Sequence, residues 1–274
     1  TVFAAGDAYC ANFEKTLRRA FTARLAVNCK EDNFMPRVLY VMPVNAPKER
    51  SDRVGAFLAK LASPGTEVQV LAMPGGPLDL EYYEQDHAAI SLMMETLPAI
   101  VRSTNVDAVV VACFYDPGVR ELREMLNIPV VGIGEASMHL ASLLGHKFSI
   151  IVARKKCIPK MSDNALLYGF EGRIASWRSI EFTVQRLHSD PNGASEAIAI
   201  EAAAAVHEDL AEVVILGCAA MEDMAQQLSM QIRVPVVDPV SAGFKLAEML
   251  GDLRARTGLS ISKIYDYESL AALE

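Results

Sequence analysis

The chain has 274 residues, of which 51% are hydrophobic and 22% are charged, and it carries a formal net charge of −8. This length is enough for one large domain or two smaller ones, each with its own core. The acidic balance and the lack of a basic run with interleaved aromatic residues exclude nucleic acid as an expected partner. No apolar run is long enough to cross a bilayer, so no membrane contact is expected either.

The five cysteines are widely spaced and odd in number, at positions 10, 29, 113, 157 and 218. They form no CxxC motif and no Cys/His cluster with zinc spacing, so neither a disulfide framework nor a metal site is predicted. Free thiols are typical of a reducing compartment, and the cytoplasm is the expected location.

Residues 1–34 show only a weak pattern and no apolar signal-peptide core. Acidic residues such as Asp7 and Glu14 argue against a transit peptide. We expect an N-terminal extension here and the folded part from residue 35. Three interpretations stay open: a native extension, a mis-assigned start, or a sequence added to the protein.

From residue 37 onward, short β-branched runs alternate with longer stretches of helical periodicity. Strands are predicted at 37–42, 67–72, 108–112, 128–131, 148–152, 173–180, 213–216 and 234–237. Helices are predicted at 49–61, 81–102, from Asp116-Pro117 onward, and at 135–144, 156–168, 194–210, 221–230 and 241–250. This alternation predicts an α/β fold of parallel sheets covered by helices.

The most informative feature is an internal repeat. One copy begins VDAVVVACFYDPG and ends at Gly145, and the other begins AEVVILGCAAMED and ends at Gly251. Both run strand, Cys, helix, Pro-Val-Val strand and helix, which is one supersecondary unit used twice. The repeat predicts two similar lobes, each a parallel sheet covered by helices, related by pseudo-two-fold symmetry with the active site between them. The expected boundaries are 35–132 plus 239–274 for lobe 1 and 133–238 for lobe 2.

The repeat places Cys113 and Cys218 at equivalent positions, each at the end of the most apolar strand of its half. Ligands of open parallel sheets bind beyond the carboxyl ends of the strands. Backbone N–H groups at a following helix start are expected to lower a thiol pKa and to hold a developing oxyanion. A single such cysteine is usually a small buried hydrophobe, but a matched pair favours catalysis.

A near-symmetric pair of thiols suits racemisation or epimerisation. Such a reaction removes a proton from one face of a carbon and returns a proton to the other face. The acid and the base exchange roles when the substrate has the opposite configuration. A thiol pKa of about 8.5 can be tuned for this work. We therefore predict that Cys113 and Cys218 are the catalytic acid and base.

At these residues the chain resembles the hydantoin/allantoin racemase branch of the aspartate/glutamate racemase superfamily. The resemblance lies in CFYDPG at 113–118, GIGEA at 132–136, GCAAM at 217–221 and the segment from Gly76-Pro77 to Asp86. It implies two α/β lobes, no cofactor, Cys113 and Cys218 as the acid/base pair, a ring substrate such as a 5-substituted hydantoin or allantoin, and a homo-oligomer. Met42, Tyr115 and Ala220 depart from the residues common in this branch, which loosens the assignment of the substrate.

The substrate-binding residues are predicted around the ends of the strands. They are Pro43, Val44, Asn45, Phe114, Tyr115, Glu135, Gly217, Ala219 and Ala220. Asp116 is interpreted as the cap of the helix that it precedes, and Cys157 as a structural residue.

Two other classes of function stay open at this point. A related superfamily reaction would use the thiols differently, as in maleate-type cis-trans isomerases, arylmalonate-type decarboxylases or amino-acid racemases. A non-enzymatic protein with two lobes could instead bind a small molecule by hinge closure.

Overall fold

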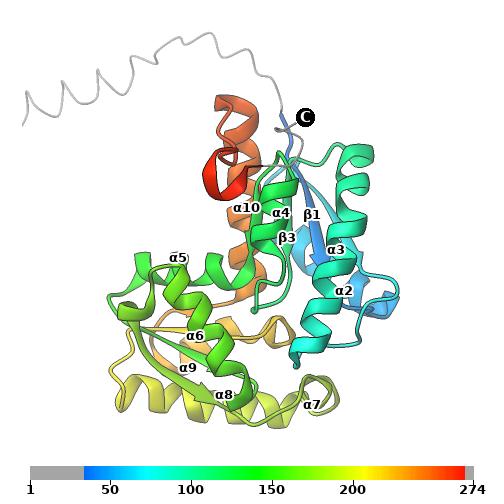
Figure 1. The fold of residues 1–274 in the computed structure, drawn as a ribbon. Coiled ribbons are helices and arrows are strands. Elements are labelled where there is room, and N and C mark those ends of the chain that lie inside the picture. The colour runs from blue at the N-terminus through cyan, green and yellow to red at the C-terminus, as the bar shows by residue number, and fades with distance from the viewer. Residues whose placement is uncertain (1–33, 269–274) are drawn as a thin grey trace, which may run out of the picture. The chain divides into compact units, whose positions relative to one another are not determined.

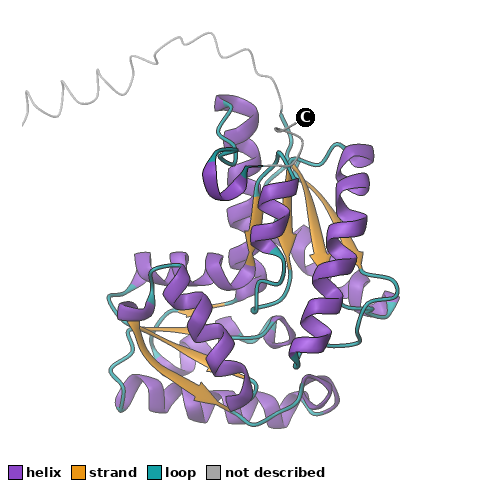
Figure 2. Cartoon of the chain, in the orientation of Figure 1, coloured by secondary structure: helices purple, strands orange, loops and turns teal. Residues whose placement is uncertain are grey.

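A computed structural model describes residues 34–268. The extension predicted at residues 1–34 lies outside this range apart from Phe34, and so do Cys10, Cys29 and residues 269–274. The described part contains two four-stranded sheets with every pairing parallel (Figure 2). Two similar parallel-sheet lobes were predicted, and the structure confirms them.

The first sheet has the strand order β2-β1-β3-β4. Its strands are β1 (Arg37–Met42), β2 (Glu67–Ala72), β3 (Ala108–Val111) and β4 (Val130–Gly132). The helices between them are α2 (Lys48–Leu61), α3 (Tyr83–Thr104) and α4 (Val119–Met125), and they can be followed in Figure 1.

The second sheet repeats this topology with the order β6-β5-β7-β8. Its strands are β5 (Phe148–Val152), β6 (Ile174–Ser179), β7 (Val213–Leu216) and β8 (Val236–Val237). The remaining helices are α5 (Ile133–Leu144), α6 (Ile158–Leu167), α7 (Val184–Ser189), α8 (Pro191–His207), α9 (Ala225–Ile232) and α10 (Pro239–Thr257). Short 3₁₀ helices lie at Lys155–Cys157, Glu171–Arg173, Ala219–Met221 and Tyr265–Tyr267.

Successive strand residues point to opposite faces, so each sheet buries two sets of side chains. In β1, Val38 and Tyr40 share a core with residues of α2 and α10, whereas Leu39 and Val41 share one with residues of α3 and α4. The second sheet is covered in the same way, by α5 and α6 on one face and by α8 and α9 on the other. Helices on both faces explain why the central strands are apolar throughout.

Helix α10 packs against both the first sheet and α5. A Cβ atom at Gly243 of α10 would lie 2.5 Å from Ile133 Cγ2 of α5, so only glycine permits this close approach. One hydrophobic core therefore runs from Tyr40 in the first sheet to Phe148 and Ile150 in the second.

One local expectation was wrong, and one short helix was missed. The helix predicted from Asp116-Pro117 begins only at Val119, after a turn in which Asp116 has φ 49° and Gly118 has φ 70°. Helix α7 was not predicted, because its six residues are too few to show a period. Within residues 34–268, none of the helices is both long and apolar enough to traverse a bilayer.

Candidate functional site

The two lobes build the surroundings of Cys113 and Cys218 in the same way. Each cysteine lies two residues beyond its strand, β3 for Cys113 and β7 for Cys218. The residue between, Ala112 or Gly217, donates its N–H at 2.8 Å to a carbonyl of the neighbouring central strand. The parallel ladder thus continues up to the residue before each thiol and fixes where the sulfur emerges.

A tight turn then follows each cysteine. The Asp116 N–H donates to the Cys113 carbonyl at 2.9 Å, and the Met221 N–H donates to the Cys218 carbonyl at 3.1 Å. Both bonds link a residue to the one three positions earlier, which is the pattern of a β-turn or a 3₁₀ turn. The repeat seen in the sequence is therefore also a repeat of backbone geometry at the thiols.

One cavity contains both thiols in its lining. Besides Cys113 and Cys218, seven of the predicted substrate-binding residues line it: Pro43, Val44, Phe114, Tyr115, Gly217, Ala219 and Ala220. The remaining walls are mainly apolar, with contributions from Met42, Val54, Leu80, Ala112, Ala153, Met161 and Val184. Residues of both lobes therefore enclose one space, as expected for a small-molecule site.

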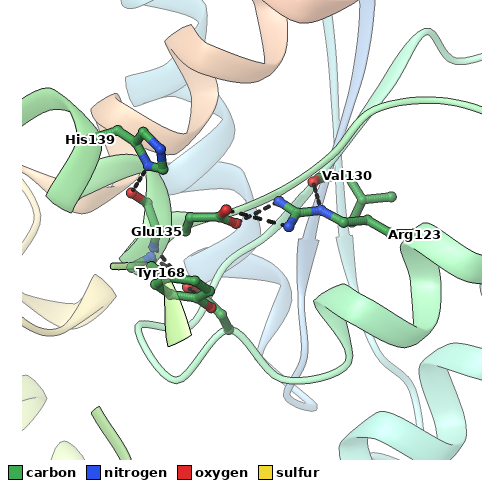
Figure 3. Close-up of polar contacts among 7 residues, drawn as sticks. Arg123, Val130, Glu135, His139 and Tyr168 are labelled. Atoms are coloured by element: carbon green, nitrogen blue, oxygen red, sulfur yellow. Dashed lines mark hydrogen bonds and ion pairs between the residues drawn. The ribbon is translucent and has the colours of Figure 1, made fainter. Parts of the chain in front are cut away.

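Two predicted residues lie elsewhere. Asn45 is exposed and lines a separate surface groove, where its N–H donates to the Pro77 carbonyl at 2.8 Å. Glu135 is not part of the cavity lining; it forms an ion pair with Arg123 at 2.5 Å (Figure 3). Arg123 also donates to the Val130 carbonyl at 3.0 Å, so the pair ties α4 to β4 and α5.

Asp116 caps a different helix from the one that was predicted. Its carboxylate accepts the N–H groups of Gly134 and Glu135 at 2.8 and 2.7 Å, in the first turn of α5, and the Tyr168 hydroxyl at 2.9 Å. Burial raises the pKa of Asp116 to about 7, although these donors oppose the shift. A Cβ atom at Gly134 would lie 2.7 Å from the Phe114 carbonyl oxygen, so the approach of α5 to this turn requires glycine.

The thiols do not have the lowered pKa that was expected from a helix N-terminus. Burial raises the pKa of Cys218 to about 11, and it raises that of Cys113 further. The N–H groups of Ala220 and Tyr115 lower these pKa values in part, each from two residues beyond its cysteine. Helices α9 and α4 begin several residues later, so desolvation outweighs their effect.

Several side chains of the cavity were not predicted. They are Tyr40, Arg50, Asp79, Glu81, Cys157 and Glu222. Glu222 directly follows the GCAAM motif, and Tyr40 points inward from a core strand. The sequence therefore indicated only weakly that both residues line the site. Arg50, Asp79, Glu81 and Cys157 enter from loops or helix starts whose approach depends on tertiary packing.

Cys157 was interpreted as structural, yet the structure places it in the same cavity as the two matched thiols. It lies at the end of the short helix Lys155–Cys157 and is buried. Its thiol lies beside the Tyr115 hydroxyl: burial raises the pKa of Tyr115, and the contact with Cys157 raises it further. In residues 34–268, no group of three or more His, Cys, Asp or Glu side chains is arranged to hold a metal ion.

Comparison with known proteins agrees with this architecture. The profile of the Asp/Glu/Hydantoin racemase family matches residues 39–247. A hydantoin racemase of Pseudomonas sp. (strain NS671) is 35% identical over 217 residues, which cover 78% of this chain and 86% of that protein. The crystal structure of an allantoin racemase from Pseudomonas fluorescens superimposes with a TM-score of 0.78 at 34% identity, covering 85% of this chain and 96% of the other.

The chain belongs to the Asp/Glu/hydantoin racemase family. It is accordingly an enzyme of the isomerase class, a racemase. A maleate isomerase from Pseudomonas putida S16, at 16% identity, 80% coverage of this chain, 93% coverage of the other and a TM-score of 0.61, shares the fold alone.

Proposed function

We propose that this enzyme racemises a ring carbon next to a carbonyl group, in a hydantoin or a hydantoin-like ring such as allantoin, with Cys113 and Cys218 as acid and base. One observation carries the proposal: two thiols with the same strand, turn and N–H environment line one cavity, each supplied by a different lobe. A two-base racemisation needs this arrangement, because one group must act on each face of the carbon.

In the proposed reaction, the thiolate of one cysteine takes the proton from the ring carbon. The C–H electron pair moves into the ring as the carbonyl becomes an enolate, and an S–H bond forms. The other cysteine, still a thiol, gives its proton to the opposite face of the carbon, and the enolate returns to a carbonyl. Each turnover inverts the carbon and leaves the two cysteines with exchanged protonation states, ready for the opposite enantiomer.

Backbone N–H groups near the sulfurs would stabilise the enolate. The turns after Cys113 and Cys218 present N–H groups toward the thiols, including those of Tyr115 and Ala220. Donors of this kind stabilise charge that develops on an oxygen in the transition state. The mainly apolar walls would exclude water and strengthen these interactions.

The choice of ring rests on the relatives and on the walls of the cavity. The sequence relative is named a hydantoin racemase and the solved structure is an allantoin racemase, and allantoin contains the hydantoin ring. Phe114 and Met42 provide flat or flexible apolar surface for such a ring. No other group is needed for the proton transfer as written.

A polarimetric assay with the separate enantiomers of 5-substituted hydantoins and of allantoin tests this function. Cys113→Ala and Cys218→Ala should each abolish racemisation, whereas Lys48→Gln on the exposed part of α2 should leave it unchanged. Single Cys→Ser variants should still exchange the ring proton of one enantiomer with solvent deuterium. Full racemisation by both alanine variants would refute the proposal.

A further inference from the structure

Arg50 is a cation of the cavity lining whose guanidinium is not in contact with any acidic side chain among residues 34–268. It lies in the first turn of α2 and forms no ion pair within 4.0 Å among residues 34–268. Its Nε atom is buried and has no hydrogen-bond partner among the same residues. A buried guanidinium nitrogen without a partner is costly, and a ligand is one means of satisfying it.

The acidic side chains of the cavity do not satisfy Arg50. Glu81 is bound by Arg154 at 2.8 Å and by the Val184 N–H at 2.6 Å. Glu222 pairs with Arg53 at 3.2 Å and interacts with Arg50 only electrostatically, beyond ion-pair distance. Asp79 lines the same cavity as Arg50, but the two side chains do not come close enough to form an ion pair.

Arg50 stands where the cavity meets the surface. Arg50, Asp79 and Val184 line both the cavity of the thiols and the adjoining surface groove. These residues therefore mark the mouth. The guanidinium is also close enough to Cys218 to favour its thiolate electrostatically, so a group bound by Arg50 would lie on the Cys218 side of the substrate.

We infer that Arg50 binds a carboxylate carried by the substrate, so that the enzyme prefers an acidic substituent beside the carbon that is inverted. Guanidinium and carboxylate match in charge and in the geometry of two parallel hydrogen bonds. For a hydantoin, the carboxylate would belong to the substituent on the ring carbon and would project toward the mouth. The identity of the ring in this inference rests on the proposed function. The binding of a carboxylate by Arg50 does not depend on it.

The test compares two ligands that differ in charge alone. The first is 5-(2-carboxyethyl)hydantoin, and the second is its carboxamide, which has the same shape. Wild-type enzyme should bind the acid about ten- to hundredfold more tightly than the amide, the range expected of a hydrogen-bonded charge pair. Calorimetric binding constants and kcat/KM for racemisation give separate readouts.

Variants assign the preference to Arg50. Arg50→Gln should remove the preference, so that the acid binds no more tightly than the amide, and Arg50→Lys should keep part of it. Asp79→Asn should strengthen the preference for the acid, because it removes a negative charge that repels the carboxylate of the ligand at the mouth. Lys48→Gln, a change of an exposed cation on the same helix, should leave the preference as in the wild type.

Equal binding of acid and amide by the wild-type enzyme would overturn the inference, and so would a preference that survives in Arg50→Gln. Glutamate and glutamine form a parallel pair of ligands without the ring. A carboxylate preference in this pair alone would keep the role of Arg50 while refuting the ring substrate. Binding of the hydantoin acid through Arg50 without racemisation would refute the proposed function alone.

Discussion

At the scale of single residues, the two cysteines are equivalent in backbone but unequal in electrostatics. Burial raises the pKa of both thiols, but it raises that of Cys113 further than that of Cys218, which Arg50 favours as a thiolate. Cys218 is therefore the thiol that ionises first in the free enzyme. The enantiomer whose proton faces Cys218 should therefore be deprotonated more readily in the free enzyme.

The pH dependence follows from this order. With the pKa of Cys218 at about 11, the thiolate fraction increases with pH throughout the neutral range. We predict that kcat/KM for racemisation rises about tenfold per pH unit between roughly pH 7 and 9, because each unit multiplies the thiolate by ten. Initial rates in buffers of constant ionic strength measure this slope, and a flat profile would show that the thiolate is already formed at pH 7.

At the scale of elements, the sequence predicted the strands better than the turns that follow them. The strand Ala108–Val111 was evident from its apolar run, and the repeat predicted the equivalent strand ends beyond which the two cysteines lie. The turn after Cys113 was mistaken for a helix start, because Asp-Pro is a common signal for one. Asp116 instead takes a left-handed conformation and reaches α5, a contact between segments 18 residues apart that no local pattern reveals.

Asp116 should stabilise α5 through its first turn. Asp116→Ala would remove the acceptor of two N–H groups and of the Tyr168 hydroxyl, and we expect a loss of about 1–3 kcal/mol in the free energy of unfolding. Tyr168→Phe removes only one of these bonds and should cost about 0.5–1.5 kcal/mol. Urea denaturation measures both values, and a smaller loss for Asp116→Ala than for Tyr168→Phe would contradict this account of the cap.

At the scale of the whole molecule, the lobes are joined by polar contacts as well as by the shared core. Glu81, from the segment between β2 and α3, accepts from Arg154 and from the Val184 N–H, both of the segment that forms the second sheet and its helices. The Glu81 side chain is 8% exposed, so this junction at the cavity is well shielded from water. Sequence reasoning missed it, because its partners are 73 and 103 residues away.

We predict that Glu81→Ala destabilises the protein by about 1–3 kcal/mol, because the partly exposed Arg154 and the Val184 N–H lose their hydrogen-bond acceptor. Glu67→Ala is a suitable control, since its ion pair with Arg37 is exposed and should contribute about 0–1 kcal/mol. Chemical denaturation of both variants measures the difference. Equal, small losses would mean that the Glu81 contacts do not hold the lobes together.

The same limit on sequence reasoning applies to the cavity. The motifs identified the residues next to the thiols, because those residues are neighbours in the chain. Arg50, Glu81 and Cys157 reach the cavity only through the packing of the two lobes, and a single sequence shows no such contacts. Glu135 shows the converse: it is close to a predicted strand end, yet an available arginine binds it outside the cavity.

The central claim, proton transfer by two thiols on opposite faces, is tested most directly by racemisation in heavy water. One enantiomer of a 5-substituted hydantoin is the substrate. In early samples the two enantiomers are separated from each other, and each is analysed for deuterium by mass spectrometry. The account predicts deuterium in nearly all of the product enantiomer and almost none in the remaining substrate, because the two faces are served by different groups. Return of the original hydrogen to the product, or rapid deuterium uptake into the unconverted substrate, would indicate a single base and contradict the account.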